Sequence, residues 1–181
     1  MAESSAPAPV DRLAEWQAVD AAVRQRQTVY GIATREQVAG KSGLALFKAM
    51  MAGELPAPPI SQTLDFILVE AELGRVVFQG RPGFAHYNPM GIVHGGWFAT
   101  LLDSALGCAV QTILPVGKAY TTAELKINIV RPLSDRVPLV RADARIIHSG
   151  GRMATADARL TGHDGKLYAH GSTTCFIFDA P

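Results

Sequence analysis

An acidic residue inside a long apolar segment is the feature of this chain that most clearly predicts chemistry. Asp103 lies within residues 94–110, and almost all other residues of that run are small or apolar. A helix that is apolar on all sides is a buried helix, and a carboxylate there needs hydrogen-bond partners or a shifted pKa. The run opens with a His-Gly-Gly sequence, which Asn88 precedes. Polar groups at a helix start, with an acid about two turns inside, predict a functional site.

Composition narrows the class of protein. A length of 181 residues and a formal net charge of +1 fit a single soluble domain with a real core. The chain has no basic run, which argues against nucleic-acid binding through phosphates. Cys108 and Cys175 lie in apolar contexts, so we expect free thiols in a reducing cytoplasm. Residues 1–9 are mostly small residues and prolines without the apolar segment of a secretory signal.

The apolar stretch 95–114 is long enough to span a membrane. Asp103 lies near its centre, there is only one such segment, and the remaining sequence is rich in strand patterns. These observations favour a core helix of a globular protein. We therefore expect no membrane association.

Residues 1–62 form an N-terminal extension with a helical pattern. Residues 1–10 are rich in Ala, Ser and Pro and predict disorder. Asp11 can cap a first helix, which has apolar residues at helical spacing. Residues 28–41 read as a linker, and Ser42 then caps a short second helix that ends at Gly53. We expect both helices to pack on the outside of the domain, or the second to help cover a hydrophobic pocket.

Residues 63–181 read as one domain. Two strand patterns, 64–70 and 75–79, form a hairpin, and a loop rich in Gly, Pro and Asn leads from it into the apolar helix. Four strand patterns follow, at 120–130, 139–148, 152–160 and 167–178, with turn signals between the later ones. An α+β fold, in which an antiparallel sheet wraps around one long central helix, satisfies this order of elements.

The segment around the helix start carries a family resemblance. The run Asn88-Pro89-Met90-Gly91-Ile92-Val93-His94-Gly95-Gly96, with Asp103 nine residues after the histidine, resembles the PaaI-type acyl-CoA thioesterases of the hotdog-fold superfamily. Residues 121–132 are similar to the strand that follows the helix in that family. The resemblance covers approximately residues 63–179, whereas residues 1–62 lie largely outside it. It implies the hotdog fold and the hydrolysis of acyl-CoA thioesters.

The resemblance implies roles for five residues. Gly95 would donate its backbone N–H to the thioester carbonyl, with the helix dipole behind it. Asp103 would act as general base or nucleophile. Its alternative role is structural, as a buried acid that holds a loop or the partner subunit through hydrogen bonds. Asn88 would orient substrate or water, or only form the turn before proline. His94 would contact the thioester or only fix the loop, and the Thr122 hydroxyl would lie near the attacking water or only reflect strand propensity.

Coenzyme A enters as part of the substrate, and the resemblance implies no separate cofactor. Gly96 would allow the substrate to approach closely. Basic side chains would surround the tunnel mouth, and Arg131, Arg152 and Lys126 are the candidates, although each could equally be a solvated strand residue. One hotdog sheet leaves an edge strand to be covered. We therefore expect a homodimer as the minimum, often paired into a homotetramer. The resemblance implies that Gly95 and Asp103 of each active site come from different protomers.

Other functions fit the sequence less well. Cys108 with His94 suggests a thiol nucleophile, but no third orienting group is evident. The five histidines lack metal-ligand spacing. Residues 86–91 faintly resemble the signature of enoyl-CoA hydratases. His86 and Gly91 stand where that signature has its two catalytic residues, which argues against hydration. A non-catalytic acyl-CoA-binding protein remains an alternative from another class, but such a protein has no need of an acid at position 103.

Overall fold

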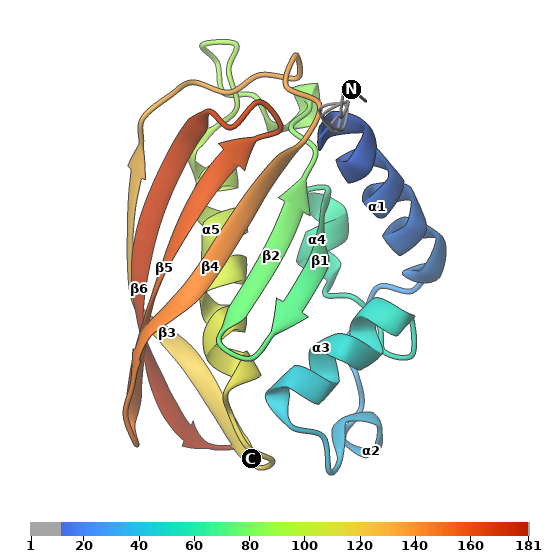
Figure 1. Ribbon diagram of the computed structural model, residues 1–181, viewed down its shortest axis with the longest axis vertical. Helices are drawn as coiled ribbons and strands as arrows, with labels where there is room; N and C mark the ends of the chain where they lie inside the picture. The colour runs from blue at the N-terminus through green and yellow to red at the C-terminus, as the bar shows by residue number, and fades with distance from the viewer. Residues whose placement is uncertain (1–11, 181) are drawn as a thin grey trace, which may run out of the picture.

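The computed structural model describes residues 12–180, and its centre is one long helix held in a curved sheet (Figure 1). Six antiparallel strands form a single sheet in the order β1-β2-β4-β5-β6-β3. The strands are β1 Phe66–Glu72, β2 Arg75–Gly80, β3 Lys118–Ile129, β4 Val140–Ser149, β5 Met153–Gly162 and β6 Leu167–Asp179. The central helix is α5, Gly95–Thr112. The α+β architecture expected from the order of strand and helix patterns is thus confirmed.

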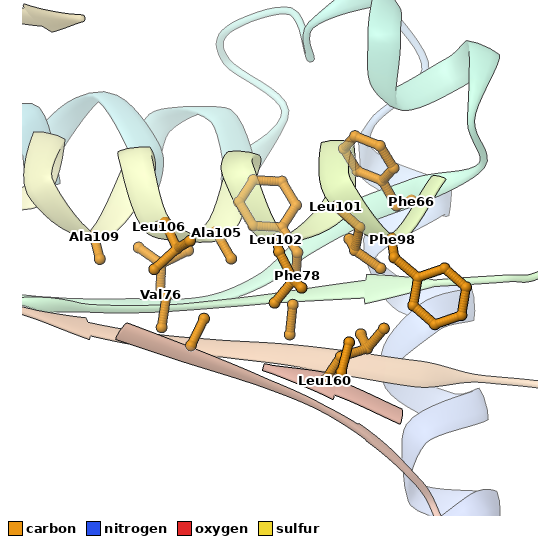
Figure 2. Close-up of a cluster of buried hydrophobic side chains, with 14 of the residues drawn as sticks. Phe66, Val76, Phe78, Phe98, Leu101, Leu102, Ala105, Leu106, Ala109 and Leu160 are labelled. Atoms are coloured by element: carbon orange, nitrogen blue, oxygen red, sulfur yellow. The ribbon is translucent and has the colours of Figure 1, made fainter. Parts of the chain in front are cut away.

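Residue size explains how closely α5 lies against the sheet. On β5, alternate residues from Ala154 to Leu160 are buried and face α5. Three of these are alanines, and their small side chains leave room for the leucines of the helix. Figure 2 shows the helix residues pointing toward the strands, where Leu101, Leu102 and Leu106 are fully buried. This one core fixes which face of α5 remains available for chemistry.

The segments before β1 contain more helix than the sequence indicated. They form α1 Arg12–Arg26, α2 Arg35–Val38, α3 Gly43–Ala52 and α4 Pro59–Thr63. The cap at Ser42 is confirmed, because its hydroxyl accepts the Ala45 N–H. The expectation of an irregular linker at 28–41 was wrong in part: a reciprocal cap between Thr34 and Gln37 starts α2. The predicted disorder at 1–10 and the cap at Asp11 lie outside the described residues.

Helix α1 packs on the outer face of the sheet, the face turned away from α5. Val19 and Val23 of α1 meet an apolar cluster on β1 and β2. The Asp20 carboxylate is fully buried and accepts hydrogen bonds from Arg24, Arg81 and Gln79. An ionised carboxylate tolerates burial when charged and polar donors surround it. This network fixes α1 against β2.

The two sheet edges differ in how they are covered. At the β1 edge lie α1 and α3 (Figure 1). Strand β3 forms the other edge, and within residues 12–180 its free side pairs with no strand. An edge strand of 12 residues presents a row of unpaired backbone groups to any further strand.

Candidate active site

The N-terminus of α5 presents one free backbone donor. His94 is the N-cap, and its Nδ1 accepts the Gly96 N–H at 2.9 Å. The neutral ring therefore carries its proton on Nε2. The N–H of Gly95 has no acceptor among residues 12–180. A free N–H at a helix start, with the helix dipole behind it, is a site for a carbonyl oxygen or an anion.

The end of strand β3 lies beside this N–H donor. A Cβ added at Gly95 would lie 3.4 Å from the Cδ1 of Ile129, at the end of β3. A Cβ added at Gly96 would lie 3.0 Å from the capping nitrogen of His94. Glycine at both positions therefore keeps the approach to the free N–H open and the cap undistorted.

Asp103 lies on α5 where one carboxylate oxygen is held and the other is open. The Thr122 hydroxyl of β3 donates to its Oδ1 at 3.1 Å. Its Oδ2 has no hydrogen-bond partner among residues 12–180. Asp103 is half-buried, because its side chain faces β3 at the edge of the sheet rather than the central strands. Water or substrate can therefore reach the carboxylate.

The groups that surround Asp103 are neutral. Burial raises the pKa of the Cys108 thiol to about 12, and it also raises the pKa of Cys175. Burial likewise raises the pKa of the Tyr120 hydroxyl, which lies against Gly107 of α5. At neutral pH these three groups stay protonated, so none of them adds a negative charge beside Asp103. A thiolate nucleophile at Cys108 is disfavoured for the same reason.

Asn88 holds the loop that leads to the helix. Its Oδ1 accepts the backbone N–H groups of Met90 and Ile92, at 2.9 and 3.3 Å. Its own N–H donates to the Ile92 carbonyl. The structure therefore shows the turn-forming role of this side chain, and its amide NH2 is left available to a ligand.

A cavity of about 350 Å³ lies next to the helix start, and both His86 and His94 line it. His86 stacks on Trp97, with ring centroids 5.6 Å apart, and its Nδ1 accepts the Gly83 N–H. Burial lowers the pKa of His86, which favours the neutral ring. Sequence reasoning missed His86 as a site residue. The sequence shows it only as a histidine in an irregular loop, and the stack with Trp97 is a long-range contact.

The three basic candidates lie in different places. Arg131 is exposed two residues beyond Ile129, at the end of the sheet that holds Gly95. Arg152 is exposed in the turn between β4 and β5, and its carbonyl accepts the Ile177 N–H. Lys126 lies on the outer face, in a shallow polar cavity with Asp157 and Arg159. Arg131 and Lys126 both lie within three residues of Ile129, the residue beside Gly95, but Lys126 is on the outer face of the sheet.

Gly95 and Asp103 are too far apart in one chain to contact the same small chemical group. Eight residues of α-helix separate them, which corresponds to about 12 Å along the axis. Both groups lie on α5, so no hinge can bring them together. Within the described part of the chain, no group of three or more His, Cys, Asp or Glu side chains could hold a metal ion, and no helix is long and apolar enough to cross a membrane.

Comparison with known proteins agrees with this fold. A family model described as the thioesterase superfamily matches residues 90–169. A solved phenylacetic acid degradation-related protein from Ralstonia eutropha is 29% identical, with a TM-score of 0.66 over 72% of this chain and 98% of that chain. A solved variant of the phenylacetic acid degradation protein PaaI from Thermus thermophilus is 27% identical, with a TM-score of 0.59 over 65% of this chain and 97% of that chain.

A curated relative matches over a shorter length. A candidate esterase of Halobacterium salinarum is 39% identical over 69 residues, which is 37% of this chain and 44% of the relative. The match therefore spans less than half of that relative. Residues 90–169 thus resemble the thioesterase superfamily, the fold is the hotdog fold of the solved neighbours, and PaaI proteins are among those neighbours.

Proposed function

We propose that this protein hydrolyses acyl-CoA thioesters to a free acid and coenzyme A. One observation carries the proposal: α5 bears a carboxylate with one open oxygen and a helix-start N–H without an acceptor. These are the base and the oxyanion donor that hydrolysis of a thioester requires. A protein that only binds acyl-CoA needs no half-exposed acid at this position.

In the proposed reaction, the Gly95 N–H donates to the thioester carbonyl oxygen and stabilises the negative charge that develops there. Asp103 either takes a proton from the attacking water or attacks the carbonyl carbon itself. The Thr122 hydroxyl holds one carboxylate oxygen, so the other faces the reacting group. If Asp103 acts as base, the C–S bond then breaks and the coenzyme A thiolate receives the proton taken from water. If Asp103 attacks, the C–S bond breaks to leave an acyl anhydride on Asp103; water hydrolyses this anhydride and supplies the proton that the thiolate receives.

The proposed active site needs two protomers. About 12 Å of helix separate the N–H and the carboxylate within one chain. Pairing of two β3 edges would join two sheets and bring α5 of one protomer beside α5 of the other. Each of the two sites would then combine Gly95 from one chain with Asp103 from its partner.

The remaining sequence candidates act as recognition groups in this proposal. Arg131, next to the Gly95 end, would bind coenzyme A phosphate. Arg152 lies in the turn between β4 and β5 and Lys126 on the outer face of the sheet, so these two would meet coenzyme A across an assembled interface. Asn88 and His94 would orient the thioester through their free NH2 and Nε2–H groups. The protein would act in the cytoplasm, as a homodimer or homotetramer.

The first test is thiol release from a panel of aromatic and aliphatic acyl-CoAs by wild type and Asp103→Asn. The oxyanion role has a sharper test. Gly95→Pro removes the N–H and keeps the helix, because the first position of a helix accepts proline. His94, with φ −63° and ψ 140°, already has the backbone shape required before proline. The proline ring adds atoms near Ile129, and Gly95→Ala controls for the first of them, the Cβ. We expect Gly95→Pro to lower kcat by about 10²–10³-fold. Gly95→Ala keeps the N–H, so its kcat should fall less than that of Gly95→Pro.

Mixing the two inactive variants tests the shared site. Random reassociation of Asp103→Asn with Gly95→Pro makes about half of the dimers mixed, and each mixed dimer has one site with both groups intact. Activity should return to about a quarter of the wild-type value, given two sites per dimer. No recovery from folded, exchanged dimers would refute the shared site. Binding of acyl-CoA without thiol release by any protein would refute hydrolysis.

A further inference from the structure

The segments that precede β1 enclose an apolar cavity of about 290 Å³. Leu46 and Met50 of α3 form one wall, and the proline-rich segment 55–59 forms the opposite one. Among the described residues that line it, only Gln111 of α5 has a polar side chain. Ile32 lies at the lining and is 91% exposed to solvent. An exposed isoleucine at an apolar cavity is a surface that a nonpolar ligand would cover.

A second cavity, of about 310 Å³, adjoins the first. The two share Val38, Leu46 and Gln111, but the second is also lined by the basic residues Arg35, Lys41 and Lys118. Lys118 pairs with Asp179 at 2.6 Å. Arg35 and Lys41 have no carboxylate partner among residues 12–180, and Lys41 donates only to a backbone carbonyl. Two unpaired cations thus stand next to an apolar cavity.

The walls of this site are fixed without a ligand. A backbone bridge joins Tyr30 to Ala57, the chain neighbours of the lining residues Gly31, Pro56 and Pro58. The Gly43 N–H, at the start of α3, donates to the Leu114 carbonyl beyond the end of α5 at 3.0 Å. Glycine is required there, because a Cβ would overlap the carbonyl oxygen of Gln111. A preformed cavity binds a ligand without the cost of ordering its own walls.

We propose that the two cavities form one binding site for a medium-chain carboxylate. The alkyl tail fills the apolar cavity, the carboxylate lies between Arg35 and Lys41, and the Gln111 amide donates at the junction. The argument for this occupant is complementarity: the apolar lining selects an alkyl chain, and unpaired cations select an anionic head. The volume of the apolar cavity is near the lower end of the volumes usual for ligand pockets, which favours a small amphiphile.

The proposed site is separate from the catalytic cluster. Gln111 follows Asp103 by eight residues on α5, about 12 Å along the helix. The free acid that the proposed hydrolysis releases can also carry an alkyl chain and a carboxyl group. The ligand could therefore bind at Asp103 instead, and the experiment separates the two locations. The binding proposal does not depend on hydrolysis, because binding is measured directly.

The test is calorimetric titration of the full chain with decanoate and with decanol. We expect saturable binding of one decanoate per chain. Arg35→Gln combined with Lys41→Gln changes two side chains at the surface of the rim and should weaken decanoate about ten-fold or more, while it leaves decanol within about two-fold. Leu46→Trp fills the apolar cavity and should weaken both ligands. Lys48→Gln, an exposed α3 residue outside the lining, is the matched control.

Three results would overturn the proposal. The first is no saturable binding of decanoate to the wild type. The second is equal binding by wild type and the double charge variant, with both folded by circular dichroism. The third is loss of decanoate binding in Asp103→Asn, which would place the ligand at the catalytic cluster. If thiol release fails while decanoate titrates as expected, the binding site stands and only the proposed hydrolysis falls.

Discussion

Replacing Gly107 with alanine tests whether the close contact between α5 and β3 sets the geometry around Asp103. A Cβ at this position would lie 2.5 Å from the Tyr120 hydroxyl oxygen and 2.7 Å from ring atom Cε2. In a free helix the change stabilises by about 1 kcal/mol, since alanine has the higher helix propensity. Forcing extra volume into a packed contact costs about 1–3 kcal/mol. Because the Tyr120 ring must move, we expect a net loss of about 1 kcal/mol.

Urea denaturation of wild type and two glycine variants gives the comparison. Gly95→Ala is the control on the same helix, since its Cβ meets only a flexible Ile129 methyl at 3.4 Å, and its stability should stay within about 0.5 kcal/mol. Tyr120→Phe removes the nearest atom and should recover part of the loss in the Gly107→Ala background. A Gly107→Ala protein at least as stable as wild type would refute the reasoning.

The same variant should affect the carboxylate. Tyr120 precedes Thr122 by two residues on β3 and lies on the same face of the strand. A displaced Tyr120 ring therefore moves Thr122 away from the Asp103 oxygen that it holds at 3.1 Å. Thiol release by Gly107→Ala should fall under conditions where the protein remains fully folded. Unchanged release, together with the expected loss of stability, would show that Thr122 does not position the acid.

Three further predictions concern stability. Gly43→Ala would push its Cβ into the Gln111 carbonyl oxygen, and it should cost about 3 kcal/mol or more in urea denaturation. Asp20→Asn leaves Arg24 without its buried counter-charge. The free energy of unfolding should fall by about 2–3 kcal/mol, which is less than the cost of breaking a fully buried ion pair because the arginine is partly exposed. Burial lowers the pKa of His86 from 6.5, so the unfolded chain binds its proton first as the pH falls. Stability should thus be full above pH 6.5 and decline below it, and His86→Asn, which keeps a hydrogen-bond acceptor, should reduce that decline.

The strands and the central helix were predictable because their burial patterns are local. Alternating alanines on β5 and the closely spaced apolar residues of α5 each mark a buried face within a few residues. The short helix α2 was missed because its only signal is the reciprocal cap between Thr34 and Gln37, in a segment without apolar periodicity. Propensity alone cannot define four helical residues when no packed face supports them.

The candidate site was predicted in part, and the errors have physical causes. The sequence indicated Asp103 and the helix start, but exposure of the acid depends on which side of α5 the sheet covers. The position of Lys126 could have been inferred from the strand alternation, since Leu125 and Ile127 on either side of it pack against the core. The place of His86 could not, because it depends on a stack with a tryptophan of another element.

In the proposed function, strand β3 links assembly to chemistry. It is the uncovered edge of the sheet, it carries the Thr122 hydroxyl that holds Asp103, and its end forms the wall beside Gly95. Pairing β3 with a second copy would satisfy its free backbone groups and restrict its motion. The same pairing would supply, in the proposed function, the second half of each active site. A substitution that weakens the β3 edge should therefore lower stability and thiol release together, because one strand supports both.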